Sequence, residues 1–506
     1  QMMMEMMGVH LPAAAFFNPH TPIREALTRA AAARLSDGIK NRSIKPIGEM
    51  LSEKSFVNAI IGLMATGGST NHTMHLVAMA RAAGIILNWD DFDDVSAIVP
   101  LLIRVYPNGQ ADVNHFAAAG GLPFVIRELL DAGLLHDDVD TVVGCGMRAY
   151  TQEPFLIGGR LKWQDAVAES RDTEVLRPAS APFSPDGGLR VMKGNIGRGV
   201  IKVSAVKDHC RIIEAPAIVF DDQKEVLAAF ERGELERDFV CVVRFQGPRA
   251  NGMPELHKLT PPLAILQDRG FQVALVTDGR MSGASGKVPA AIHMSPETLL
   301  GGGIGKIRTG DIIRFNSHTG ELTALVDEAE WNGRETVAAD LSGNRHGIGR
   351  ELFAGFRSIT GSAETGAMSL GGDTALILPA LAASRAMPIL RDLNQCCSEN
   401  NIRITGQLGK TLYGFDAFQT NRRAGDGDGL RRNHFAGHAA GGVGCDGQFG
   451  YDVDLMRSAG LQRTEERVGG SVRTGQEYAQ PAEERREERE YGTGGGEDEC
   501  QCGRQA

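Results

Sequence analysis

The chain has 506 residues, 42% of them hydrophobic, and its 53 basic and 63 acidic residues give a formal net charge of −10. This length is enough for two or three domains, each with its own core. The acidic balance argues against a nucleic-acid partner but leaves room for a local basic pocket that binds a small anion. No run of eighteen apolar residues occurs, so no membrane span is expected.

Neither secretion nor zinc binding is indicated. The opening residues lack the basic flank and apolar stretch of a signal peptide, which predicts a cytoplasmic location. No pair of cysteines has C-x-x-C spacing. Because the first residue is Gln1 and not methionine, we expect the chain to begin inside a longer protein.

Residues 1–175 are expected to be mostly helical, with short apolar runs between the helices. Thr21 and Pro22 indicate a helix start, since threonine caps helices and proline suits their first turn. Small residues at 66–70 precede Asn71, His72 and a second expected helix. Such residues let a backbone approach a ligand closely.

Residues 176–373 are predicted to form a strand-rich α/β domain. Strands are expected at 189–193, 200–204, 239–245 and 273–277, helices at 222–232 and 261–268, and a hairpin with strands at 311–316 and 321–326. Residues 374–506 look like an atypical tail, rich in Gly, Arg, Glu, Asp and Gln from 421 onward. That composition predicts a largely disordered segment.

Two loops concentrate small and polar residues next to apolar strands. The loop 244–258 presents Glu255 between turn-forming glycines and prolines, which suits a hard cation such as Mg²⁺; a solvated surface glutamate is the alternative. The segment 274–287 passes from an apolar strand into a Gly/Ser-rich loop with Ser282, the usual place for an active site in an α/β sheet. A structural turn is the alternative here, and the spacing is not that of a P-loop.

Five motifs, in order, resemble those of the dihydroxy-acid and phosphogluconate dehydratase family over residues 1–373. They are Gly67-Gly68-Ser69-Thr70-Asn71, Asp112-Val113-Asn114-His115-Phe116 with Gly120-Gly121, Gly194-Asn195, Gly252-Met253-Pro254-Glu255, and the string from Leu275 to Ser285. The residues around Asn71-His72, 247–252 and 286–289 are similar to the phosphogluconate branch. The resemblance implies a partial N-terminal α/β domain followed by a barrel-like α/β domain, with a homodimer as the assembly.

The resemblance also implies a reaction. It is the dehydration of 6-phosphogluconate to 2-keto-3-deoxy-6-phosphogluconate, a step of the Entner–Doudoroff pathway. Ser282 would remove the C2 proton, an iron–sulfur cluster would act as Lewis acid on the C3 hydroxyl, and Glu255 would bind Mg²⁺. For the phosphorylated sugar acid, we take His72, Arg249, Lys258 and Lys287 as candidate binding residues, because a phosphate needs cationic or N–H donors.

The cofactors implied are a [4Fe–4S] cluster and Mg²⁺. None of the eight cysteines falls at a family cluster position, so the cluster ligands are expected upstream of residue 1. Two alternatives stay open: a dehydratase for another sugar acid or dihydroxy acid, and an inactive truncated product that lacks the cluster ligands.

Overall fold

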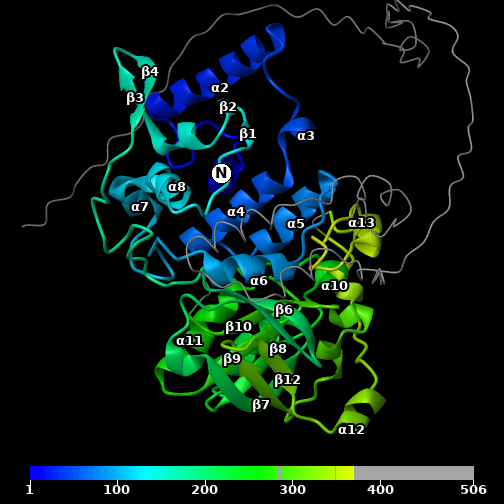
Figure 1. Ribbon diagram of the computed structural model, residues 1–506. Helices are drawn as coiled ribbons and strands as arrows, with labels where there is room; N and C mark the ends of the chain where they lie inside the picture. The colour runs from blue at the N-terminus through cyan, green and yellow to red at the C-terminus, as the bar shows by residue number, and fades with distance from the viewer. Residues whose placement is uncertain (283–286, 348, 370–506) are drawn as a thin grey trace, which may run out of the picture. The chain divides into compact units, whose positions relative to one another are not determined.

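The computed structural model describes residues 1–282, 287–347 and 349–369 (Figure 1). All of these belong to one unit, Gln1–Gln419. The expected disordered tail, 374–506, lies outside the described residues. No helix in the described part of the chain is long and apolar enough to cross a membrane.

Helices dominate the first part of the chain, as expected. They are α1 (Met2–Met6), α2 (Pro22–Lys40), α3 (Ile47–Met50), α4 (Glu53–Thr66), α5 (His72–Ala82), α6 (Trp89–Ile98), α7 (Val113–Ala119) and α8 (Gly121–Asp131). Two small hairpins follow, β1 (Asp140–Thr141) with β2 (Gly144–Cys145) and β3 (Gln152–Ile157) with β4 (Arg160–Asp165). The predicted start of α2 is confirmed, since the Thr21 side chain accepts the backbone N–H of Arg24.

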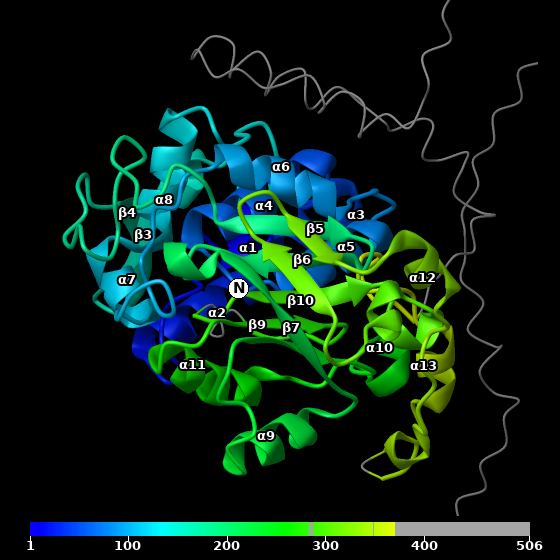
Figure 2. The ribbon, with the colours of Figure 1, turned by 90° about the horizontal axis from the view of Figure 1, so that it is seen from below.

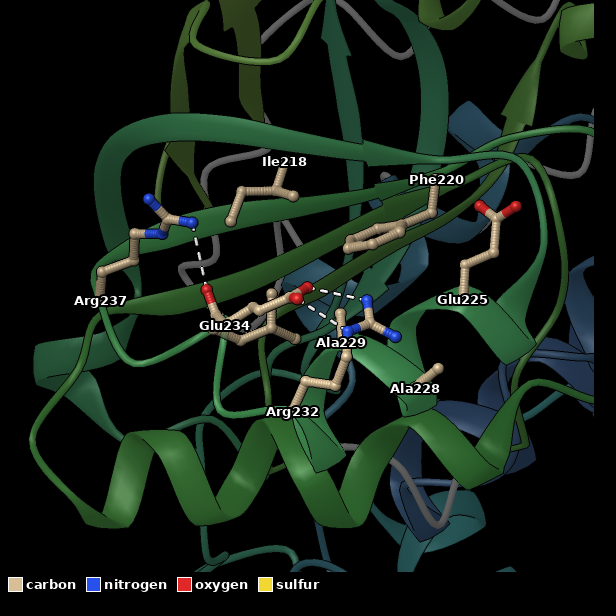
Figure 3. A pocket seen from close by; sticks show the side chains of 9 residues that line it. Ile218, Phe220, Glu225, Ala228, Ala229, Arg232, Glu234 and Arg237 are labelled. Carbon is tan, nitrogen blue, oxygen red and sulfur yellow. Dashed lines mark hydrogen bonds and ion pairs between the residues drawn. The ribbon is translucent and has the colours of Figure 1, made fainter.

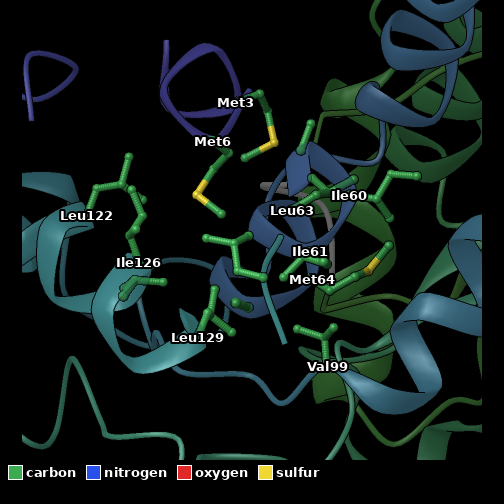
Figure 4. Close-up of a cluster of buried hydrophobic side chains, with 14 of the residues drawn as sticks. Met3, Met6, Ile60, Ile61, Leu63, Met64, Val99, Leu122, Ile126 and Leu129 are labelled. Atoms are coloured by element: carbon green, nitrogen blue, oxygen red, sulfur yellow. The ribbon is translucent and has the colours of Figure 1, made fainter. Parts of the chain in front are cut away.

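Helix α4 is the centre of this part because almost every one of its residues is buried. Figure 4 shows the apolar cluster around it, to which α1 contributes Met3 and Met6 and α8 contributes Leu122, Ile126 and Leu129. Close packing of α1 on α4 requires Gly62, where an added Cβ would lie 2.5 Å from Met6. Burial of these side chains is the main force that holds the helices together.

The second part is a closed eight-stranded barrel, which confirms the predicted α/β fold class. Its strands are β5 (Leu189–Gly194), β6 (Gly197–Lys202), β7 (Ile212–Phe220), β8 (Phe239–Val243), β9 (Val273–Thr277), β10 (Ala290–Ser295), β11 (Ile312–Asn316) and β12 (Glu321–Ala324). The order around the barrel is β10-β6-β5-β12-β11-β7-β8-β9. Strands β7 to β10 are parallel neighbours, and the other pairs are antiparallel except β12 with β5.

Successive side chains along the barrel strands point alternately inward and outward, and both the interior and the outer surface carry apolar residues. Ala217, Val242 and Ala274 belong to a cluster drawn from all the strands, which fills the interior. Cys241 and Leu275, one residue out of step, pack outside it against helices. The α-helices in this second part of the chain are α9 (Gln223–Glu231), α10 (Pro248–Asn251), α11 (Thr260–Asp268), α12 (Glu328–Gly333) and α13 (Ala354–Ile359).

Short 3-10 helices occupy several connections. They are η1 (Arg148–Thr151), η2 (Asp208–Cys210), η3 (His257–Leu259), η5 (Thr298–Leu300), η6 (Gly303–Lys306) and η7 (Ser342–Asn344).

Helices α5 and α6 lie against the barrel, as both ribbon views show (Figures 1 and 2). Met74 of α5 and Trp89 of α6 belong to the same apolar cluster as Val191 and Val200 of β5 and β6. The contact brings the start of α5 to the loops that follow the parallel strands.

Candidate functional site

The loops after β8, β9 and β10 meet at one buried carboxylate. Asp278, the first residue after β9, accepts the backbone N–H groups of Phe245 at 3.2 Å, Gln246 at 2.8 Å and Thr298 at 2.9 Å. Burial raises the pKa of Asp278 above its usual range, and these N–H donors oppose the rise. The three loops are thereby fixed relative to one another.

Glu255 and Ser282, 27 residues apart, are brought together beside Arg280. One carboxylate oxygen of Glu255 accepts the backbone N–H of Ser282 at 2.8 Å, and the other lies 2.8 Å from the Arg280 guanidinium. The side chains of Glu255 and Arg280 are 27% and 33% exposed, so solvent and small molecules reach the pair. The two predicted residues therefore occupy one polar, accessible place.

Backbone contacts fix this arrangement. Leu256 donates its N–H to the Arg280 carbonyl at 3.1 Å, and the Arg280 side chain donates to the Met253 carbonyl at 2.7 Å. Gly252 and Met253 both have left-handed φ values, +71° and +53°, which turn the chain so that Glu255 faces the β9 loop. The turn chemistry of 247–255 thus positions the carboxylate.

The start of α5 and the residues just before it join the same site. Thr70 donates its hydroxyl to the carbonyl of Met281 at 3.2 Å, one residue before Ser282. His72 is half-buried, with Nδ1 3.1 Å from the Ser69 carbonyl. Burial lowers the pKa of His72, and His75, 6.3 Å away between ring centroids, acts in the same direction. His72 is therefore a neutral group near neutral pH.

The other candidate binding residues are more dispersed. Arg249 of α10 donates its side-chain N–H to the carbonyl of Thr360, which anchors α10 to the segment after α13. Both lysines are exposed. Lys258 lies in η3, and Lys287 lies three residues before the start of β10. The two carboxylate oxygens of Glu255 accept from Arg280 and from the backbone of Ser282, and from neither lysine.

Glu297 was missed by the sequence reasoning. It is 2% exposed and accepts the backbone N–H groups of Arg249 at 2.9 Å and Ala250 at 3.2 Å. Burial raises its pKa to about 7, against the effect of these donors, and the charge of Asp278 adds to the rise. Its one sequence signal is the Ser-Pro-Glu at 295–297 after a buried strand.

The described residues offer no cluster of side chains that could by itself hold a metal ion. No group of three or more His, Cys, Asp and Glu side chains that could hold a metal occurs in the described ranges. Cys145 is exposed in a hairpin, Cys210 lies in η2 and Cys241 is buried in β8. Glu255 uses both carboxylate oxygens, on Arg280 and on the N–H of Ser282.

Two hollows lie away from this site. Figure 3 shows one of about 350 Å³ on the outside of the barrel, floored by apolar side chains of β7 and α9 and bordered by Arg232, Glu234 and Arg237. Arg232 and Glu234 are paired with each other at 2.7 Å, which leaves little free charge for a ligand. The other, of about 520 Å³, is lined mainly by the end of α2, the segment that follows it and Val142.

Fold and site together define an α/β-barrel protein whose polar site lies where parallel strands end. Two family models match the chain: the dihydroxy-acid/6-phosphogluconate dehydratase N-terminal model at residues 1–150 and the C-terminal model at residues 174–367. The chain belongs to the dihydroxy-acid/6-phosphogluconate dehydratase family, which confirms the resemblance seen in the sequence.

Curated relatives favour one branch of this family. The chain is 59% identical to a phosphogluconate dehydratase of Pseudomonas aeruginosa over 370 residues and 58% identical to one of Escherichia coli K12 over 368. These matches cover 73% and 72% of the chain and 61% of each relative. A dihydroxy-acid dehydratase of Ignicoccus hospitalis is 38% identical over 343 residues, covering 66% of the chain and 58% of that protein. The chain thus spans about three fifths of the length of the relatives it matches.

Proposed function

We propose that this chain carries the barrel side of the active site of a phosphogluconate dehydratase and acts on 6-phosphogluconate. The observation that carries the proposal is the contact of Glu255 with both Ser282 and Arg280, formed by two motifs that the sequence shares with the family. The higher identity to relatives named phosphogluconate dehydratase, 58–59% against 38%, favours this substrate over a branched-chain dihydroxy acid.

In the proposed reaction Ser282 takes the proton from C2 of the sugar acid. The electron pair of that C–H bond forms the C2–C3 double bond, the C3–O bond breaks, and the departing hydroxide takes up the proton from Ser282 to leave as water. The resulting enol becomes the 2-keto-3-deoxy acid by moving a proton to C3. A serine hydroxyl is a weak base, so a nearby positive charge must favour its alkoxide. We assign this role to Arg280, whose guanidinium shares Glu255 with the Ser282 backbone.

Glu255 serves here as a positioning group. By accepting the N–H of Ser282 and the guanidinium of Arg280 at once, it sets the distance between the base and the cation. The iron–sulfur cluster and Mg²⁺ implied by the family would supply Lewis acidity for loss of the C3 hydroxyl. Among the described residues, no group of three or more His, Cys, Asp and Glu side chains could hold a metal ion.

The phosphate group of the substrate needs a cationic side chain that solvent can reach near the site. Lys258 and Lys287 are exposed, whereas the guanidinium of Arg249 is held by the Thr360 carbonyl. We therefore propose the two lysines ahead of Arg249 as phosphate ligands, with His72 as a neutral hydrogen-bonding group. The homodimer and the cytoplasmic location stay predictions.

The test is anaerobic turnover of 6-phosphogluconate by the chain after iron–sulfur reconstitution with Mg²⁺, read as formation of a 2-keto acid. Turnover that Ser282→Ala abolishes would support the proposal. Equal turnover by both proteins would contradict the role of Ser282. Absence of turnover in both, with no binding of 6-phosphogluconate by calorimetry, would favour an inactive product.

Substrate choice is tested in the same assay with gluconate and 2,3-dihydroxyisovalerate. Turnover that prefers 6-phosphogluconate, and that Lys258→Ala or Lys287→Ala weakens through KM, is expected. A preference for either unphosphorylated acid would move the assignment to another branch of the family.

A further inference from the structure

His293 in β10 combines three features that each cost a folded protein stability. It lies where the pairing of β10 with β6 shifts register, between Ile292 and Ser295. Its φ is +62°, a conformation that residues with a side chain rarely adopt. Its Nε2 is buried and has no hydrogen-bond partner within the described residues. Such costs persist where the surrounding structure needs a side chain in one place.

The contacts of His293 join two parts of the site. Its backbone N–H donates to the carbonyl of Gly279 at 2.9 Å, at the start of the turn that leads to Ser282. Its ring faces the N-terminal helices: Nδ1 is 3.4 Å from the Thr73 hydroxyl of α5, and the ring centroid is 6.4 Å from that of Trp89. One residue thus touches both the β9 loop and α5.

The hydrogen bonds around Thr73 define which ring nitrogen carries the proton. A threonine hydroxyl has one hydrogen to donate, and that of Thr73 is closer to the Thr70 carbonyl, at 2.8 Å, than to His293. Nδ1 of His293 must then donate to the Thr73 oxygen, which leaves Nε2 as an unprotonated acceptor. Trp89 cannot serve as its donor, because the Trp89 indole N–H donates to the Thr73 carbonyl.

The ring is neutral at physiological pH. Burial lowers the pKa of His293 to about 3, and the charges of Arg280 in the loop and His75 on α5 act in the same direction. The hydrogen bond between His293 and Thr73 therefore joins two neutral groups, and the tautomer of the ring decides which of them donates.

We propose that His293 is a positioning residue, which holds the turn 279–282 against the first turn of α5 as the Nδ1-protonated neutral imidazole. The inference rests on the proposed function only in taking Ser282 as the base. A second bond across the same boundary runs from Thr70, just before α5, to the Met281 carbonyl, so this turn contacts the N-terminal part of the chain at more than one point.

The first test reads the tautomer in the 506-residue chain by nitrogen-15 NMR of labelled histidine at pH 7.5. Loss of one signal set in His293→Asn assigns the residue among the 13 histidines. The expected result is the Nδ1–H form in the unaltered chain and in Thr73→Ser, with that preference lost in Thr73→Val. The Nε2–H form in the unaltered chain would overturn the proposal.

The second test reads the turn itself by hydrogen exchange of the amides at 279–282. His293→Asn keeps an N–H donor near Nδ1 and suits a positive φ, so it should exchange like the unaltered chain. His293→Phe keeps a ring beside Trp89 but no donor, and we expect its amides, like those of Thr73→Val, to exchange about ten-fold faster or more. If His293→Phe fails to fold, Thr73→Val against Thr73→Ser still decides. Unchanged exchange in Thr73→Val would overturn the proposal, and neither readout requires turnover.

Discussion

Asp278 illustrates how a single carboxylate can order three loops. One of its oxygens accepts the N–H of Gln246, and the other accepts those of Phe245 and Thr298. In Asp278→Asn the amide oxygen can replace only one carboxylate oxygen, so at least one buried N–H would face an NH₂ group. We expect a loss of about 1 to 3 kcal/mol in the free energy of unfolding, measured by urea denaturation.

The matched control for this change is Asp340→Asn, in which an exposed carboxylate accepts the single N–H of Ser342. That variant should stay within roughly 0.5 kcal/mol of the unaltered chain. Equal stability of the two variants would mean that the buried acceptor at 278 is dispensable.

Glu297 should make stability depend on pH. Its pKa is raised from 4.5 to about 7 in the folded chain, so the folded state binds the proton more tightly than the unfolded state. The stability from this group is complete below pH 4.5 and is lost as the pH rises through 7. The full change corresponds to roughly 3 kcal/mol.

In Glu297→Gln this contribution disappears. Unfolding free energies measured in urea at pH 5, 6, 7 and 8 should fall less steeply with pH than those of the unaltered chain. Parallel curves for the two proteins would show that Glu297 ionises normally in the folded state.

At the scale of elements, the barrel closes through a narrow seam between β5 and β12. The two strands pair at Glu321 and Lys193 alone, and Gly194 packs so closely that an added Cβ would lie 2.0 Å from the Leu322 carbonyl oxygen. Backbone cannot yield as a flexible side chain can. Gly194→Ala should therefore destabilise the chain by about 2 to 4 kcal/mol, or prevent folding.

Gly333→Ala is the control for that substitution, because nothing lies within 4 Å of a Cβ added at position 333. Its melting temperature should stay close to that of the unaltered chain. A tolerated Gly194→Ala would mean that β5 and β12 can separate without loss of the barrel.

How far the sequence predicts these elements depends on how uniform each strand is. The expected strand 273–277 matches β9, because all five residues are apolar or small and buried, and the expected hairpin appears as β11 and β12. Strands β7 and β10 were not predicted. Glu214 and Pro216 interrupt the apolar pattern of β7, and a register shift and His293 interrupt that of β10. Long-range pairing supplies what these segments lack locally.

The residues of the site also differ in how far the sequence reveals them. Glu255 and Ser282 were found because each sits in a distinctive motif, and the structure brings them together. Glu297 and His293 were not found, since a lone carboxylate or imidazole carries no local sign of the N–H groups or hydroxyl it will meet. Their partners lie 47 or more residues away in the chain.

At the scale of the whole described unit, the site depends on contact between the helices and the barrel. Trp89 is fully buried in a cluster that also contains Val191 and Val200 of the barrel. Arg198 of β6 pairs with Asp90 of α6 and with Glu364 at 3.0 Å each, so the segment after α13 returns to the same boundary. The proposed division into domains at 175 and 176, and at 373 and 374, stays a prediction.

Because the two parts share one apolar cluster, we expect them to unfold together. A chain ending at residue 369 should show one thermal transition, with the calorimetric enthalpy equal to the van't Hoff enthalpy. Trp163→Phe and Trp331→Phe together leave Trp89 as the one tryptophan of three, and its fluorescence should change at the same temperature as the circular dichroism of the barrel and helices. Met74→Ala, which removes a 4% exposed side chain from the shared cluster, should lower that single transition. Two separated transitions, with Met74→Ala shifting just one of them, would show that the helical part and the barrel unfold independently. The loop that carries Ser282 would then not depend on the helices for its stability.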